Sequence, residues 1–117
     1  MDDLDTLVPA WLTIPEVAER LEVNVTRVRR LVQDRYLVAV RRGERKVLSV
    51  PEALLADGEP MPDLRGTLTV LADSGYDAEE SLRWLFTPDD SLPGRPVDAL
   101  RAGRKTEVRR RAQTLAF

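Results

Sequence analysis

The chain has 117 residues, enough for one ordinary domain or for two very small ones that pack together. It contains neither histidine nor cysteine, which excludes disulfides, the usual zinc sites and nucleophilic mechanisms that depend on histidine. No apolar run approaches the roughly 18 residues that cross a bilayer, and the acidic start is unlike a signal peptide. We therefore expect a soluble intracellular protein that is not an enzyme, with no metal, no cofactor and no membrane contact.

The net charge of −2 conceals a strong segregation of charge along the chain. Residues 24–50 carry eight basic and two acidic side chains, and residues 101–117 carry six and one. The other segments are acidic, with six acidic and one basic side chain in residues 1–23 and eleven and three in residues 51–100. Because a local patch sets the field at a binding surface, the block at 24–50 indicates a nucleic-acid partner.

We expect residues 1–10 to form a flexible acidic arm, since Pro9 interrupts any helix that would run directly into the fold. The apolar end of this arm, with Leu7 and Val8, is expected to dock on the core. Thr6 stands among aspartates in this arm. A Ser/Thr kinase that phosphorylated Thr6 would add negative charge close to a DNA-binding surface. The alternative interpretation of Thr6 is an ordinary solvated residue.

Residues 13–50 are typical of two short helices around a tight turn, followed by a β-hairpin. Thr13 and Glu16 have the spacing of a capping box at the start of the first helix. Asn24 is the expected N-cap of the second helix. Val23, in the turn, is expected to pack between the two helices.

The second helix, expected over residues 25–35, has its apolar residues at helical spacing on one face. The opposite face carries side chains that can read base edges, because arginine is the usual partner of guanine in the major groove. The alternative for such a face is simple solvation. The candidate base-reading residues are Thr26, Arg27, Arg30 and Gln33.

Strand-forming residues at 37–40 and 46–50 flank a basic segment in which Gly43 can take a positive φ. This pattern predicts a wing whose tip lies on the phosphate backbone or in the minor groove. A solubilising loop is the alternative. The candidate phosphate contacts of the second helix and the wing are Arg29, Arg41, Arg42, Arg45 and Lys46.

The rest of the chain predicts a linker and a helical module. Gly58, Pro60 and Pro62 fall close together, which favours a linker or an ordered loop. Helical spacing of apolar residues resumes at Leu64. The expected organisation is an arm at 1–10, a DNA-binding domain at 11–56, a linker at 57–63 and a helical domain for packing or dimerisation at 64–117.

The run LTIPEVAERLEVNVTRVRRLV, continued by LVAVRRGERKVLSVPEAL, resembles the winged helix-turn-helix of the excisionase and MerR-like class. Glu22 departs from that class, which often has glycine here because the turn favours a left-handed residue. The shape of the turn is therefore the point at which this chain is expected to differ.

The C-terminal half looks like the toxin-binding domain of Xre/MbcA/ParS-type antitoxins. Over residues 11–117 the chain looks most like a small actinobacterial family of winged-helix DNA-binding regulatory proteins, with WLFTPDDSL and RPVDAL as the most specific segments. The residues that carry the antitoxin resemblance are Trp84, Leu85, Pro88, Leu92, Gly94, Pro96, Val97, Leu100, Gly103 and Val108.

Together these patterns predict a mainly α fold with a small β-hairpin wing, a winged helix-turn-helix followed by a helical C-terminal module. The expected function is binding to double-stranded DNA as a transcriptional regulator or chromosome-associated factor, in the cytoplasm on the nucleoid. A single module has a small footprint, so we expect a homodimer through the C-terminal helices. The alternative is an antitoxin-like module that binds a protein partner through those helices.

Overall fold

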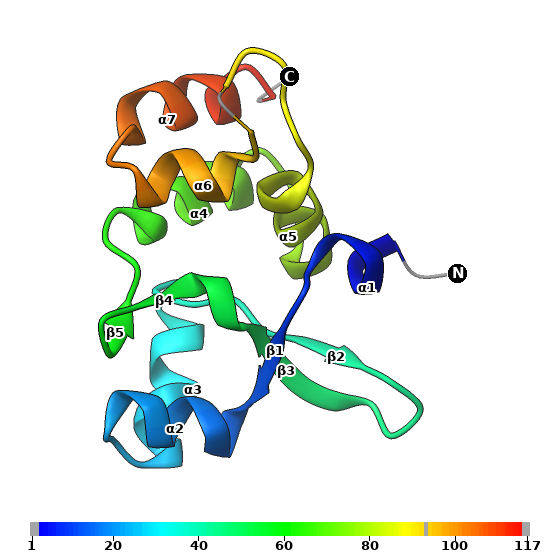
Figure 1. The fold of residues 1–117 in the computed structure, drawn as a ribbon, viewed down its shortest axis with the longest axis vertical. Helices are drawn as coiled ribbons and strands as arrows, with labels where there is room; N and C mark the ends of the chain where they lie inside the picture. Colours follow the sequence, from blue (N-terminus) through cyan, green and yellow to red (C-terminus); the bar gives the residue numbers. More distant parts are fainter. Residues whose placement is uncertain (1–2, 93, 116–117) are drawn as a thin grey trace.

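The structure, a computed structural model, describes residues 3–92 and 94–115 and consists of two halves stacked along the long axis (Figure 1). The N-terminal half contains α1 (Asp3–Leu7), β1 (Trp11–Thr13), α2 (Ile14–Leu21), α3 (Val25–Gln33), β2 (Val40–Arg42) and β3 (Val47–Pro51). A 3-10 turn (Glu52–Leu54) and a small hairpin of β4 (Leu55–Ala56) and β5 (Glu59–Pro60) follow. The C-terminal half contains α4 (Leu64–Asp73), α5 (Ala78–Phe86), α6 (Pro96–Arg101) and α7 (Lys105–Gln113). The predicted fold class is confirmed.

Both helices of the helix-turn-helix begin at the predicted caps. The Thr13 hydroxyl accepts a hydrogen bond from the Glu16 N–H at 3.3 Å, and the Glu16 carboxylate accepts one from the Thr13 N–H at 2.8 Å. These bonds, the one from the Thr13 backbone first, lower the pKa of Glu16. The Asn24 side chain accepts from the Arg27 N–H at 2.8 Å. The predicted start of α3 at Val25 is thus confirmed.

The turn between α2 and α3 has the left-handed geometry of its class although it lacks glycine. Glu22 adopts φ 59° and ψ 45°, and its N–H donates to carbonyls in the last turn of α2. The prediction that Val23 packs between the helices is wrong, because Val23 is 38% exposed. Val17 of α2 and Val28 of α3 are fully buried instead, and the two helices pack against each other.

The wing belongs to a three-stranded antiparallel sheet in the order β1-β3-β2. Leu12 pairs with Val50 and Arg41 pairs with Leu48. The predicted strand at 37–40 is mostly absent, because Leu37 and Ala39 are buried in the core ahead of β2. The hairpin tip is therefore residues 43–46, and β1 is a third strand that the sequence did not predict.

The predicted flexible arm is instead a helix that packs on the C-terminal half. Leu4 and Val8, one turn apart, are each 2% exposed. Helix α1 contacts α5 and ends at Leu7, ahead of Pro9 (Figure 1). Two apolar residues at i, i+4 spacing provide a buried face that the acidic composition of the segment conceals.

The predicted linker at 57–63 is also ordered. Asp57 and Gly58 both have positive φ and form the turn between β4 and β5. Met61 is 3% exposed, and its N–H donates to the Leu54 carbonyl at 2.8 Å. This segment therefore connects the halves as a packed structure.

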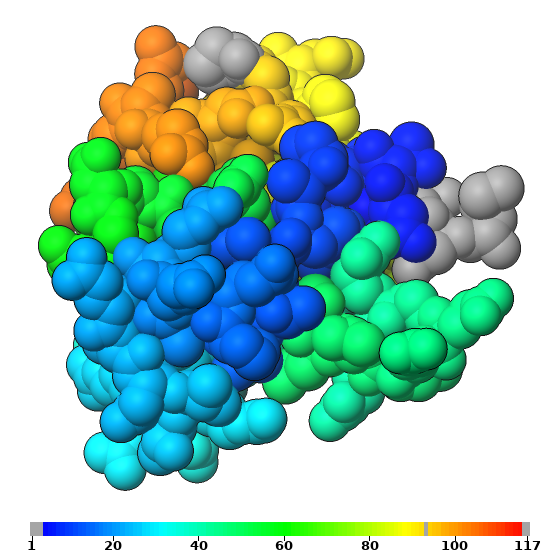
Figure 2. All heavy atoms as spheres, turned by 60° about the horizontal axis from the view of Figure 1, so that its bottom comes forward, coloured from blue at the N-terminus to red at the C-terminus, as the bar shows by residue number. Residues whose placement is uncertain are grey.

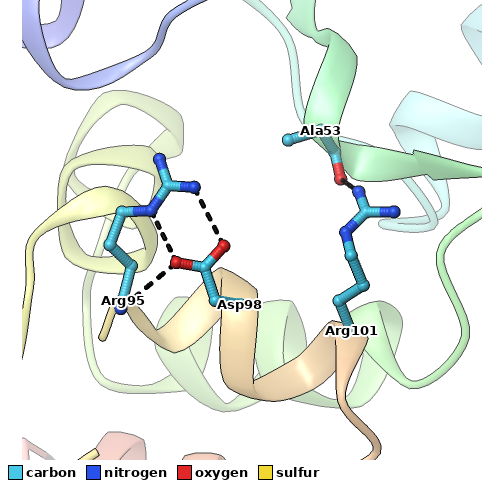
Figure 3. A network of polar contacts seen from close by, with 4 residues as sticks. All are labelled: Ala53, Arg95, Asp98 and Arg101. Carbon is cyan, nitrogen blue, oxygen red and sulfur yellow. Dashed lines mark hydrogen bonds and ion pairs between the residues drawn. The ribbon is translucent and has the colours of Figure 1, made fainter. Parts of the chain in front are cut away.

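The two halves share one hydrophobic core and are joined by arginines of the C-terminal half. Arg101 donates a hydrogen bond to the Ala53 carbonyl (Figure 3). It donates another, at 3.4 Å, to the Leu55 carbonyl. Arg95, the N-cap of the same helix, forms an ion pair with Asp98 at 2.8 Å, which lowers the pKa of Asp98. No helix in the described part of the chain is long and apolar enough to cross a membrane.

We predict that Glu22→Gly stabilises the protein. Glycine adopts a left-handed conformation without the roughly 1–2 kcal/mol that an L side chain costs there, and its greater freedom in the unfolded chain offsets part of the gain. The expected result is a free energy of unfolding about 0.5–1 kcal/mol higher in urea denaturation.

The matched control is Glu19→Gly, the same change at an exposed position inside α2. It should lower the free energy of unfolding by about 1 kcal/mol, because glycine weakens a helix interior. Destabilisation by both substitutions would contradict the assigned conformation of Glu22.

Candidate nucleic-acid interface

Helix α3 presents one continuous polar face to solvent. Packing of Val28 and Leu31 against the core turns this face outward. Thr26, Arg30 and Gln33 lie at i, i+4 and i+7, so their side chains form one stripe. All the predicted base-reading residues are exposed, namely Thr26, Arg27, Arg30 and Gln33, together with Arg29 beside them.

The α3 face keeps its positive charge because the fold supplies no carboxylate to neutralise it. Within residues 3–92 and 94–115, Arg27, Arg29 and Arg30 form no ion pair. The Asn24 cap also marks the positive end of the helix dipole, which adds to the attraction for phosphate. The face is therefore suited to a polyanion.

The wing places three of its four predicted cations at the surface. Arg45 and Lys46 lie in the exposed tip. Arg41 is exposed on β2, and its guanidinium donates to the Lys46 carbonyl at 3.1 Å, which braces the tip. Figure 2 shows the wing beside the helix-turn-helix on one side of the molecule.

Arg42 is separated from the other wing cations. Its guanidinium donates to the Asp5 carboxylate on α1 at 2.7 Å and lies 4.8 Å from the centre of the Trp11 ring. Arg41 and Arg42 point to opposite faces because successive strand residues alternate. This alternation is the sequence signal that distinguishes Arg42 from the exposed phosphate-contact candidates of the wing.

The comparisons with known proteins agree over both halves. Residues 2–55 match the family model of the DNA-binding protein Rv2175c, wHTH domain, and residues 61–116 match that of the Rv2175c C-terminal domain of unknown function. The chain belongs to the Rv2175c family. The DNA-binding protein Rv2175c of Mycobacterium tuberculosis is 41% identical, over 99% of this chain and 86% of the relative. The NMR structure of Rv2175c has a TM-score of 0.83 and 40% identity, and the match covers 92% of this chain and 82% of that one.

Membership of the Rv2175c family confirms the resemblance to an actinobacterial winged helix-turn-helix family. The family model that matches the C-terminal half is that of Rv2175c, so the comparisons do not favour the antitoxin interpretation. Within the described residues, no group of three or more acidic side chains gathers in a way that could hold a metal ion.

Three residues beside α3 were missed by the sequence analysis. Arg35 is exposed and has φ 68°, and Tyr36 is 43% exposed. Arg65 of α4 stacks on Tyr36, with its Cζ 5.0 Å from the ring centre. The sequence carries no signal for this contact, since Arg65 is distant in the chain and only the folded junction brings it to α3.

Thr6, the predicted phosphorylation site, is exposed on α1. Asp5, which precedes it, is the carboxylate that holds Arg42. Thr6 is therefore adjacent in the chain to Asp5, which contacts Arg42 of the wing.

We predict that Asp5→Asn releases the Arg42 side chain. The charged hydrogen bonds to Asp5 protect the Arg42 Nε–H from exchange with water, and a neutral amide binds guanidinium more weakly. In Asp5→Asn, the Arg42 Nε–H should exchange with water about tenfold faster than in the wild type, as measured by NMR. The control is Glu44→Gln, which removes an equal charge from the wing tip, at a distance from α1, and should leave the Arg42 exchange rate unaltered. Equal exchange rates in Asp5→Asn and the wild type would contradict the pairing of Arg42 with Asp5.

Proposed function

We propose that this protein binds double-stranded DNA through α3 and the wing, with a preference for particular sequences. The observation that carries the proposal is the exposed α3 face, whose three arginines have no acidic partner among the described residues. The printed name of the M. tuberculosis relative, a DNA-binding protein, supports it. The proposed role is binding without catalysis, in transcriptional regulation or chromosome organisation, in the cytoplasm on the nucleoid.

In the proposed complex, α3 lies in the major groove. Arg27 and Arg30 donate paired hydrogen bonds to guanine, and Gln33 pairs with adenine in the same way. Thr26, at the start of the stripe, contacts a base edge or the methyl group of thymine. Each well-formed bidentate contact contributes about 1–3 kcal/mol of discrimination against the wrong base.

The remaining cations set the register by holding phosphates. Arg29 does so from α3, and Arg45 and Lys46 do so from the wing tip. Arg41 supports the tip through the Lys46 carbonyl and is itself exposed to a phosphate. Arg42 joins them only after its ion pair with Asp5 opens, so its contribution to affinity is expected to be smaller.

A homodimer through the C-terminal helices would double the small footprint of one module. Val108 and Ala112 of α7 are buried within the monomer. Among the described residues, the exposed large hydrophobic side chains are Val23, Tyr36 and Val47, all in the N-terminal half. The proposed dimer contact is therefore polar, through exposed residues such as Arg104.

We propose that phosphorylation of Thr6 by a Ser/Thr kinase weakens DNA binding. A phosphate brings a charge of about −1.5 to −2 at neutral pH. Thr6 is exposed on α1 and follows Asp5, which contacts the wing. The added charge therefore lies near the strand whose tip is proposed to touch the DNA backbone.

The proposed function is tested by titrating duplex affinity against salt. The logarithm of the binding constant should fall linearly with the logarithm of salt concentration, with a slope of about −0.9 per neutralised phosphate. Arg45→Ala should make this slope shallower by about 0.9, because one phosphate contact is lost.

Arg42→Ala should change that slope less than Arg45→Ala, since Arg42 is already paired. The control is Arg110→Ala, which removes an equal charge from α7 at the opposite end of the molecule from α3 (Figure 1). Affinity that does not change with salt would refute DNA binding by this surface.

We predict that Thr6→Glu weakens DNA affinity by about two- to tenfold at low salt, through electrostatic repulsion that fades as salt screens it. Fluorescence anisotropy on a labelled duplex measures the change. Thr106→Glu adds the same charge at an exposed site at the start of α7 and should have less effect. Equal DNA affinities for Thr6→Glu and the wild type would contradict regulation of DNA binding by phosphorylation of Thr6.

A further inference from the structure

The end of α3 depends on a residue in an unfavourable conformation. Arg35 has φ 68°, a left-handed conformation that glycine adopts freely and arginine does not. The Tyr36 N–H donates to the Leu31 carbonyl at 2.9 Å, and the Arg35 N–H donates to the Val32 carbonyl at 3.2 Å. These two bonds form a Schellman ending, which persists only while Arg35 stays left-handed.

Arg65, from α4, holds the residues on both sides of Arg35. Its Nε donates to the Asp34 carbonyl at 2.9 Å, and its guanidinium stacks on the Tyr36 ring with Cζ 5.0 Å from the centre. Asp34 is the C-cap of α3, so this carbonyl lies at the negative end of the helix dipole, where a cation is favoured.

The position of Arg65 is itself fixed by the C-terminal core. Its neighbour Leu64 is fully buried, and Leu68 and Leu71 of the same helix are also buried. The Arg65 backbone therefore cannot follow α3 if that helix end moves. Arg65 connects the last turn of α3 to the core of a different half of the protein.

We propose that Arg65 is a positioning residue, through which the C-terminal half keeps the last turn of α3 wound and thereby sets sequence preference. Arg30 and Gln33, two of the base-reading candidates, lie in this last turn. Fraying there would move both side chains relative to base edges. The proposal rests on the proposed function, in which α3 reads DNA, and it gives the C-terminal half a part in that function.

An alternative role for Arg65 follows from its exposure near α3. Arg65 and Arg27 line the same surface hollow, together with Asp34, Tyr36 and Met61. An exposed arginine at this place can also bind a phosphate directly. A phosphate contact and a positioning contact differ in their salt dependence, so an experiment can separate them.

The first measurement needs no DNA. In Arg65→Ala, amide hydrogen exchange at Tyr36, followed by NMR, should be at least about tenfold faster, because opening of the last turn becomes easier. The Val108 amide in the core of the C-terminal half should keep its exchange rate, which checks that the variant is folded. An unchanged Tyr36 rate would overturn the proposal, whatever happens to DNA binding.

The second measurement compares a preferred duplex with a random one over a range of salt. Arg65→Ala should lower the ratio of the two affinities about tenfold while the salt slope on random DNA stays the same. A slope shallower by about 0.9 with an unchanged ratio would identify Arg65 as a phosphate contact and overturn the proposal. Arg110→Ala on α7 is the charge-matched control.

A double substitution provides the sharpest test. Arg35→Gly removes the cost of the left-handed conformation, so the helix end should depend less on Arg65. Adding Arg65→Ala to Arg35→Gly should then lower the affinity ratio by no more than about twofold. A full tenfold loss in that background would contradict a role through the helix end. A wild-type protein with no sequence preference would refute the proposed function, while the exchange data would still decide the role of Arg65.

Discussion

The burial of Val28 and Leu31 is the constraint on which the account of this protein depends. These side chains are nearly or completely removed from solvent, and each contributes about 1.5–3 kcal/mol by leaving water. Because they lie on one stripe of α3, their burial fixes the rotation of the helix about its axis. The same packing that stabilises the helix therefore places Arg27 and Arg30 on the outer face.

Arginine side chains join segments that are far apart in the sequence. Arg42 binds Asp5 across the wing and α1, Arg65 binds the Asp34 carbonyl across α4 and α3, and Arg101 binds the Ala53 carbonyl. The contacts of Arg65 and Arg101, with a shared core, join the two halves. Arg42, Arg65 and Arg101 are thus used by the fold, whereas the arginines of the α3 face and Arg45 of the wing tip remain for a partner.

The sequence predicted the elements whose signals are local. Caps at Thr13 and Asn24 and the apolar spacing of α3 are properties of a few adjacent residues, and they placed the helix-turn-helix correctly. The exposure of Val23 and the helical form of α1 were mispredicted because both depend on partners far along the chain. The proximity of Arg65 to Tyr36 is likewise set by packing of the halves. For the candidate site, local spacing identified the exposed α3 face, whereas the separation of Arg42 required knowledge of where β2 begins.

Whether the α3 face reads base sequence can be measured by selecting binding sites from random duplexes with the intact protein and with Arg30→Ala. We expect an enriched motif for the wild type and loss of preference at one position of that motif for Arg30→Ala, with about 1–3 kcal/mol less discrimination there. Identical motifs from the two proteins, or no motif from the wild type, would contradict base reading by the α3 face.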